Sequence, residues 1–440
     1  MKRPGKNNPL KVAIYTLGCR VNQFESDCLL ERFQALGWEA VSFKGKADLY
    51  IVNTCAVTHE AQRQSAQMIR QSINRHPESL VVAAGCAAQL FHPDYEKIPG
   101  LDFITGSFQK LDIPFKISSL KKTESPHLLL SPESEQTIVA QFPKPGQRTR
   151  ALVRIQEGCN AQCSYCLVPR ARGRSRSLLM KEVVSGVETL AGQGIKELIL
   201  TGIHLGQYGE DLGLKESLVS LLEVLLPKHS EVTFRLSSLE PQEVTPALLG
   251  LFTKYPNLCP HLHIPLQAGE DSLLKRMNRS YSTDFYRRLI RTIHQEIPFG
   301  AIGADLIIGF PGEEEALFRK TVEFITDLPL SYLHIFPFSA RPGTPAAGFP
   351  NPVPEKTKKN RLQIARSIDK QKREAFADRC LGETFSALIL QADQEKGSYQ
   401  ALTENYLTVS VFGRFKRNDR VLVRLKARDP LKGLIGECRP

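Results

Sequence analysis

Three cysteines in one short segment have a spacing that suits an iron–sulfur cluster. They form the pattern Cys159-x-x-x-Cys163-x-x-Cys166. Thiolates this close in one loop can ligate three irons of a [4Fe–4S] cluster, which leaves one iron for a small chelating ligand. Structural zinc is the alternative, but zinc sites usually have a fourth protein ligand and paired Cys-x-x-Cys motifs. Because no fourth ligand lies close in sequence, the spacing favours the cluster.

Three further cysteines each follow a predicted strand. The cysteines are Cys19, Cys55 and Cys86, and the strands are 11–17, 48–53 and 80–84. Helical patterns at 23–36 and 58–73 separate these strands, and such alternation predicts a parallel sheet. The carboxyl ends of parallel strands share one edge, so the three thiols can converge there. Unrelated buried cysteines are the alternative, but the same position after three strands favours a shared metal site.

The sequence from residue 151 onward predicts two further domains. Strand patterns lie at 151–156, 196–201, 231–236, 261–265, 302–308 and 332–336, and helical patterns lie at 179–191, 216–226, 283–293 and 315–326. Six strand–helix units fit a partial barrel better than a complete eight-unit barrel. A Pro-rich stretch at 342–354 ends this region. Short strands at 386–390, 407–411 and 420–425 then predict a small β-barrel.

The composition indicates a globular protein of several domains. With 440 residues the chain is long for a single core, and its apolar fraction of 42% and charged fraction of 24% are ordinary. No apolar run approaches the ~20 residues of a membrane span, and the start lacks the apolar core of a signal peptide. We therefore expect a cytoplasmic protein with no membrane partner. Thiols stay reduced in that compartment, which favours metal binding over disulfides.

The charge is strongly basic, with 58 Lys and Arg against 46 Asp and Glu and a net charge of +12. Such a balance favours a polyanionic partner such as nucleic acid. Two groups of basic residues are the predicted RNA contacts: Arg170, Arg172, Arg174 and Arg176 after the cluster loop, and Arg414, Lys416 and Arg417 in the tail. A solvated basic loop and the charged outer face of a strand are the alternatives.

The cysteine motif, placed after a strand that opens a βα barrel, resembles the radical S-adenosylmethionine superfamily. Several other segments resemble the methylthiotransferases: 16–26 (TLGCRVNQFES), 53–58 (NTCAVT), 84–89 (AGCAAQ), 265–269 (PLQAG) and 305–313 (DLIIGFPGE). The basic tail resembles the RNA-binding TRAM domain of that family. The resemblance implies S-adenosylmethionine on the open iron of the first cluster. It also implies a second [4Fe–4S] cluster, on Cys19, Cys55 and Cys86, that serves sulfur insertion.

The resemblance implies an α/β fold with three domains. They are an N-terminal parallel-sheet domain with the second cluster at 9–118, a partial (β/α)6 radical-SAM barrel at 148–376, and a TRAM-like β-barrel at 377–440. A linker at 119–147 separates the first two domains. Five residues in the matching motifs are expected to contact S-adenosylmethionine: Tyr165, Thr201, Gly202, Ser237 and Gln267. Tyr165 occupies the aromatic position that packs near the adenine in the superfamily.

Three segments look most like the branch of the family that acts on threonylcarbamoyladenosine: 18–23 (GCRVNQ), 200–209 (LTGIHLGQYG) and 235–241 (RLSSLEP). This resemblance implies addition of a methylthio group to that adenosine beside the tRNA anticodon. The expected partners are the tRNA anticodon stem-loop, an electron donor such as a flavodoxin or ferredoxin system, and a sulfur donor. The alternatives are isopentenyladenosine in tRNA, a ribosomal-protein aspartate, or a non-catalytic iron–sulfur RNA-binding protein.

Overall fold

The computed structural model describes residues 9–117, 121–130, 138–146, 148–213, 217–393, 397–429 and 433–439. These residues form two compact units. The first unit consists of the described parts of Met1–Gly146, Gln156–Leu178 and Ser339–Ala347, and the second of those of Gln147–Ile155, Leu179–Phe338 and Gly348–Pro440. Among the described helices, none combines the length and the apolar character needed to cross a membrane.

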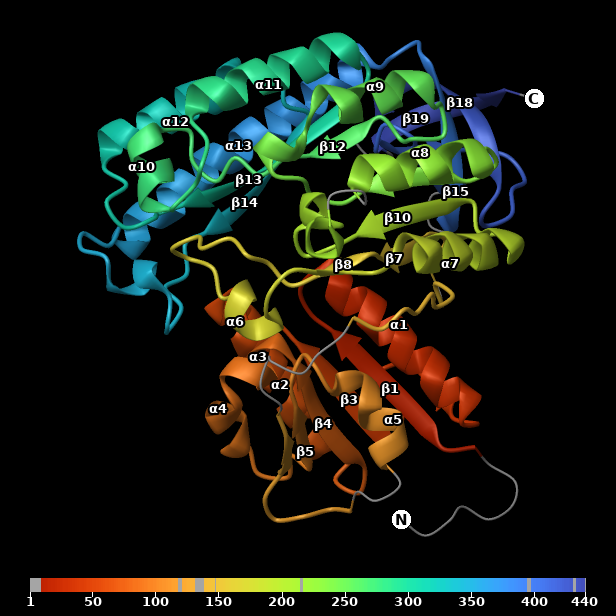
Figure 1. The fold of residues 1–440 in the computed structure, drawn as a ribbon, viewed down its shortest axis with the longest axis vertical. Coiled ribbons are helices and arrows are strands. Elements are labelled where there is room, and N and C mark those ends of the chain that lie inside the picture. Colours follow the sequence, from red (N-terminus) through yellow and green to blue (C-terminus); the bar gives the residue numbers. More distant parts are fainter. Residues whose placement is uncertain are drawn as a thin grey trace. The chain divides into compact units, whose positions relative to one another are not determined.

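A six-stranded parallel sheet forms the centre of the first unit (Figure 1). Its strands are β1 (Lys11–Thr16), β2 (Glu39–Ala40), β3 (Leu49–Thr54), β4 (Leu80–Gly85), β5 (Phe103–Thr105) and β6 (His127–Leu129), in the order β2-β1-β3-β4-β5-β6. Every residue of β3 and β4 is buried, as expected for central parallel strands that are covered on both faces. The strand β6 lies inside the segment 119–147, so the interpretation of that whole segment as a linker is wrong where β6 pairs with β5.

The two faces of this sheet are covered by different helices. The helices are α1 (Arg20–Ala35), α2 (His59–Arg75), α3 (Cys86–Leu90), α4 (His92–Glu96) and α5 (Ile113–Lys116). Successive residues of β3 point to opposite faces, and they belong to two apolar clusters. Ile51 packs with Leu29 of α1, whereas Val52 packs with Ile69 of α2. The predicted alternation of strands and helices is confirmed.

The second unit contains the six predicted barrel strands in two parallel sheets, β11-β10-β7 and β12-β13-β14. Their bounds are β7 (Ala151–Arg154), β10 (Glu197–Thr201), β11 (Thr233–Leu236), β12 (His261–His263), β13 (Ala301–Ile308) and β14 (Tyr332–Pro337). The backbone N–H of Cys259 donates to the carbonyl of Phe234 at 2.8 Å, which links the two sheets. The result is the partial barrel expected from the sequence.

Seven α-helices of the second unit accompany these strands (Figure 1). They are α7 (Met180–Gly192), α8 (Leu218–Lys228), α9 (Pro246–Lys254), α10 (Asp271–Arg276), α11 (Thr283–Glu296), α12 (Glu315–Asp327) and α13 (Glu355–Arg379). Several begin with a side-chain cap: Ser282 accepts a hydrogen bond from the backbone N–H of Phe285 at the start of α11. Such caps satisfy backbone donors that have no partner in the first turn.

The tail forms a closed five-stranded β-barrel in the order β15-β16-β17-β19-β18. Its strands are β15 (Thr384–Asp393), β16 (Ser398–Thr403), β17 (Thr408–Val411), β18 (Arg420–Asp429) and β19 (Gly433–Arg439). Val409, Val423 and Leu425 fill its interior and are fully buried. The predicted small barrel is confirmed, although the sequence did not reveal β16 and β19. It belongs to the same compact unit as the six strands of the partial barrel.

Candidate iron–sulfur and cofactor sites

The cluster loop lies in the first unit, between β8 (Gln156–Glu157) and α6 (Val168–Arg172). Cys159, Cys163 and Cys166 are all partly exposed. The backbone N–H groups of Ala161 and Val168 donate to the sulfurs of Cys159 and Cys166, each at 3.4 Å. Hydrogen bonds to the ligating sulfurs are a regular feature of iron–sulfur sites. The donor set therefore fits the iron–sulfur cluster that the spacing predicted.

The start of this loop is held by its own backbone. Gly158 has φ +75°, and a Cβ there would lie 2.0 Å from the carbonyl oxygen of Arg174. Only glycine allows this approach. The amide of Gln156 donates to the carbonyl oxygen of Gly158 and to the hydroxyl of Ser175, each at 2.8 Å. The position of Cys159 is therefore fixed by contacts between β8 and the segment that follows α6.

The other three thiols stand at the carboxyl ends of neighbouring strands. Cys19 follows β1, Cys55 follows β3, and Cys86 follows β4. Gly18 has φ +90°, and a Cβ at this position would lie 2.8 Å from the sulfur of Cys55. Burial, together with smaller contributions from the charges of Cys86 and Cys19, raises the pKa of Cys55 to about 12. The structure therefore brings these thiols together, as the strand pattern predicted.

Polar residues of the N-terminal motifs tie these strand ends together. The side-chain amide of Asn22 donates to the carbonyls of Leu17 and Thr54, at 2.7 and 3.1 Å. Asn53 donates in turn to the carbonyl of Asn22 at 2.9 Å. The hydroxyl of Thr54 donates to the carbonyl of Ala84 at 2.7 Å. These bonds cross three strand ends, which explains why Asn and Thr lie beside the cysteines.

Arg172 connects the cluster loop to the N-terminal thiols. Its side chain is 2% exposed, and its guanidinium donates to Glu25 at 3.1 Å and to Glu157 at 2.6 Å. Its Nε also lies 3.2 Å from the sulfur of Cys86. Burial alone would lower the pKa of Arg172, but the surrounding negative groups, Cys86 first among them, raise it. The prediction of RNA contact at Arg172 is thus wrong for this structure, because its charge is enclosed and paired.

The neighbouring basic residues differ from Arg172 in exposure. Arg170 and Arg174 are exposed, and their contact with RNA stays a prediction. Arg176 is half-buried, donates to the carbonyl of Arg172 at 2.8 Å and lies over the ring of Phe108. The guanidinium of Arg176 is thus partly engaged in contacts within the protein, and its contact with RNA stays a prediction.

Four of the predicted cofactor residues lie at one edge of the strands of the second unit. Thr201 ends β10 and is followed by Gly202, Ser237 follows β11, and Gln267 follows β12. The hydroxyl oxygens of Thr201 and Ser237 are buried and have no hydrogen-bond partner among the described residues. A buried hydroxyl without a partner is costly, so both suit a polar ligand. This fits bound S-adenosylmethionine, while the individual contacts, including that of half-buried Tyr165 in the first unit, stay predictions.

A second polar group in the same unit was not found from the sequence. Nε2 of His263 lies 2.8 Å from a carboxylate oxygen of Asp305, and Nδ1 of His334 lies 3.4 Å from it. The hydroxyl of Tyr332 lies 2.8 Å from His261 and 3.1 Å from His263. Burial opposes ionisation of Asp305, but the hydrogen bonds with the two histidines lower its pKa. The residues come from three strands, and of these only Asp305, which opens the motif 305–313, belongs to a recognised motif.

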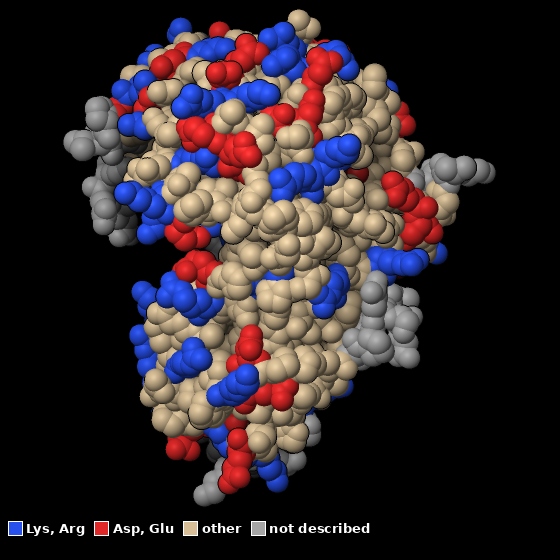
Figure 2. Space-filling model, turned by 90° about the vertical axis from the view of Figure 1, so that its left-hand side faces the viewer, with Lys and Arg blue, Asp and Glu red and all other residues tan. Residues whose placement is uncertain are grey.

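The basic tail residues Arg414, Lys416 and Arg417 are exposed. Nε of Arg417 donates to the hydroxyl of Thr149 at 2.9 Å, whereas the side chains of Arg414 and Lys416 have no partner among the described residues. On the face shown in Figure 2, Lys and Arg are interspersed with Asp and Glu. The exposed cations are thus available to phosphates, and RNA contact there stays a prediction.

Two family models match separate parts of the chain. Residues 11–106 match the model described as "Uncharacterized protein family UPF0004". Residues 153–325 match the radical SAM superfamily. A solved structure of the radical S-adenosylmethionine methyltransferase TsrM from Kitasatospora setae shares the fold, with a TM-score of 0.56 at 16% identity. That match covers 77% of this chain and 75% of the other.

Curated relatives match nearly the whole chain. Threonylcarbamoyladenosine tRNA methylthiotransferase MtaB of Aquifex aeolicus is 36% identical over 91% of this chain and 96% of its own, and MtaB of Bacillus subtilis is 33% identical over 90% and 89%. The tRNA-2-methylthio-N(6)-dimethylallyladenosine synthase of Dictyoglomus thermophilum is 34% identical over 79% and 80%. The partial barrel and its cysteine loop define a radical S-adenosylmethionine enzyme. Within that class, the chain belongs to the MiaB-like methylthiotransferase family.

Proposed function

We propose that this enzyme converts N6-threonylcarbamoyladenosine beside the tRNA anticodon into its 2-methylthio derivative. The observation that carries the proposal is that both sets of three cysteines lie in one compact unit. Arg172 bonds to Glu157, two residues before Cys159, and also lies 3.2 Å from the sulfur of Cys86. A reaction that needs two iron–sulfur sites has its ligand sets in the same folded unit.

When bound, S-adenosylmethionine and the two clusters would supply a radical, a sulfur atom and a methyl group. Cys159, Cys163 and Cys166 would hold the first cluster, and Cys19, Cys55 and Cys86 the second. The chain's own residues hold these ligands in place. Gly18 and Gly158 let the backbone approach closely, and Asn22 fixes the strand ends. The buried hydroxyls of the second unit would orient the cofactor. The proposed reaction also requires two partners: an electron donor such as a flavodoxin or ferredoxin system, and a sulfur donor.

The choice of substrate rests on motifs and relatives together. The segments 18–23, 200–209 and 235–241 resemble the threonylcarbamoyladenosine branch, and the relatives named MtaB reach 36% identity. The relative named for dimethylallyladenosine reaches 34%, so identity alone favours neither substrate. Methylthiolation of dimethylallyladenosine in tRNA is therefore the second candidate.

The experiment is mass spectrometry of nucleosides from total tRNA of a deletion strain and of the strain rescued by this gene. Loss and return of methylthio-threonylcarbamoyladenosine supports the proposal. Loss and return of methylthio-dimethylallyladenosine alone supports the second candidate. Cys86→Ala should keep cleavage of S-adenosylmethionine but abolish methylthiolation. Cys28→Ala, a buried cysteine of α1 outside both sites, is the matched control and should keep both activities.

A further inference from the structure

Arg341 is a buried arginine whose donors are incompletely used. It lies in the first unit and is 1% exposed. Its Nη2 donates to the side-chain oxygen of Gln62 at 2.6 Å, and its guanidinium carbon lies 4.7 Å from the centre of the Phe91 ring. Its Nε and Nη1 are buried without a hydrogen-bond partner among the described residues. Buried, unpaired donors on a charged group are costly, so this arrangement points to an absent anionic partner.

No carboxylate within the described part of the chain forms an ion pair with Arg341. Asp94 is reached only through Gln62, whose amide donates to it at 3.1 Å. Arg172, the other buried arginine near the N-terminal thiols, is different because it pairs with Glu25 and Glu157. Among the described residues Arg341 thus has no direct carboxylate partner, and Asp94 acts on its charge only from a distance.

The apolar cluster beside Arg341 is shared with the N-terminal cysteines. Phe91 packs on the apolar cluster that contains Ala56, the neighbour of Cys55, and Cys86 packs on that same cluster. Burial lowers the pKa of Arg341, while the negative charge of Cys55 raises it. Three thiolates outweigh the charge of an oxidised cluster core, so a cluster held there is anionic, and added hydrosulfide makes it more so.

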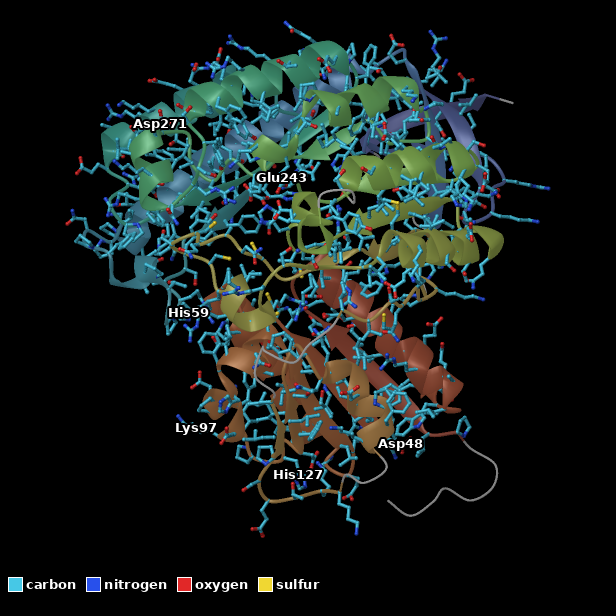
Figure 3. The ribbon with its side chains drawn as sticks, in the orientation of Figure 1. Asp48, His59, Lys97, His127, Glu243 and Asp271 are labelled. Atoms are coloured by element: carbon cyan, nitrogen blue, oxygen red, sulfur yellow. The ribbon has the colours of Figure 1, made fainter. Side chains whose placement is uncertain are left out.

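The segment that carries Arg341 is fastened to α2. The backbone N–H of His59 donates to the hydroxyl of Ser339 at 3.1 Å, and its ring lies 2.7 Å from the carbonyl of Ala340. His59, labelled in Figure 3, also lines a surface cavity of about 470 Å³. Gln62 and Phe91, which contact Arg341, line the same cavity.

We propose that Arg341 donates hydrogen bonds, through Nε and Nη1, to an anionic sulfur at the site of Cys19, Cys55 and Cys86. That sulfur is either a sulfide of the cluster itself or a hydrosulfide bound to its open iron. The inference rests on the proposed function, because it needs the second cluster. It assigns Arg341 a binding role that the cysteine motifs do not show. No bond of the substrate forms or breaks at Arg341.

The test uses the full chain with Cys159, Cys163 and Cys166 replaced by Ala, so that only the N-terminal site holds a cluster. The reduction potential is measured by redox titration with electron paramagnetic resonance, and the same signal reports binding of added hydrosulfide. The variants are Arg341→Gln, Arg341→Lys and the control Arg63→Gln. Arg63 lies on the same helix α2 but is exposed and pairs with Glu60.

Arg341→Gln should lower the equilibrium constant for reduction of the cluster at least tenfold, which is a fall of 59 mV in the reduction potential for one electron. Alternatively, it should raise the dissociation constant of hydrosulfide by the same factor. A change in potential identifies a cluster sulfide as the acceptor, and a change in affinity identifies hydrosulfide. Arg341→Lys keeps the charge and should give a smaller change, and it carries the test if Arg341→Gln assembles no cluster. If a variant at Arg341 holds the cluster and neither its reduction potential nor its affinity for hydrosulfide changes, the inference about Arg341 is wrong, while the proposed function is unaffected. Absence of a cluster from the parent overturns the proposed second cluster as well.

Discussion

Replacing Arg172 should destabilise the first unit more than any exposed arginine. Arg172→Gln keeps a polar side chain of similar length but removes the charge that faces Glu25 and Glu157. Lys110 still pairs with Glu25, so the main loss is at Glu157, whose side chain is 9% exposed. Breaking a buried ion pair by removing one partner costs about 3–5 kcal/mol. We expect a loss in that range.

The chain has a built-in reporter for this loss. Trp38 is its one tryptophan, belongs to the first unit and packs edge-on against Phe33 at 5.2 Å. Its fluorescence during urea unfolding therefore reports on the unit that contains Arg172. With a slope near 2 kcal/mol per M, the expected loss lowers the unfolding midpoint by about 2 M.

Two comparisons give this prediction its controls. Arg63→Gln removes an exposed arginine that pairs only with Glu60, and it should leave the midpoint unchanged because surface pairs are screened by water. The double variant Arg172→Met/Glu157→Met leaves no unpaired charge at that position and should regain part of the loss. If Arg172→Gln shifts the midpoint no further than Arg63→Gln, the buried network does not stabilise the fold as argued.

Three other predictions concern the metal and RNA sites. Gly18→Ala should lose about half of the bound iron, because the added methyl would approach the sulfur of Cys55; Gly37→Ala, with φ +80° and no atom within 4 Å, should keep it in the same iron analysis. The high pKa of Cys55, about 12, means that iron must displace a proton from this thiol. The Fe²⁺ affinity of cluster-free protein should therefore rise by about tenfold per pH unit for each displaced proton between about pH 6.5 and 8.5, and a flat profile would contradict this account. Binding of tRNA should weaken steeply with salt, and Arg414→Gln or Lys416→Gln should each reduce the slope of log K against log salt by about one; a slope equal to that of the parent would mean that neither side chain contacts phosphate.

The sequence by itself determined the local elements and the ligand sets. Buried strands such as β3 and β4 are continuous apolar runs, so their existence and type follow from burial on both faces. The cysteines after these strands could be assigned to one site because parallel strands end at one edge. The strands β16 and β19 were missed, because Ser398–Thr403 and Gly433–Arg439 include polar or glycine positions that interrupt the apolar pattern. Their pairing depends on closure of the barrel.

Only the tertiary structure decided the partners of the buried arginines. Arg172 was one of four basic residues in a run, and nothing in its neighbourhood distinguished it from Arg170. The fold pairs it with Glu25, 147 residues earlier. Arg341 meets Gln62 across 279 residues. Periodicity records which face of an element is apolar, whereas the partner of a buried charge depends on which distant segments pack together. For that reason the thiols were visible in the sequence and the charges around them were not.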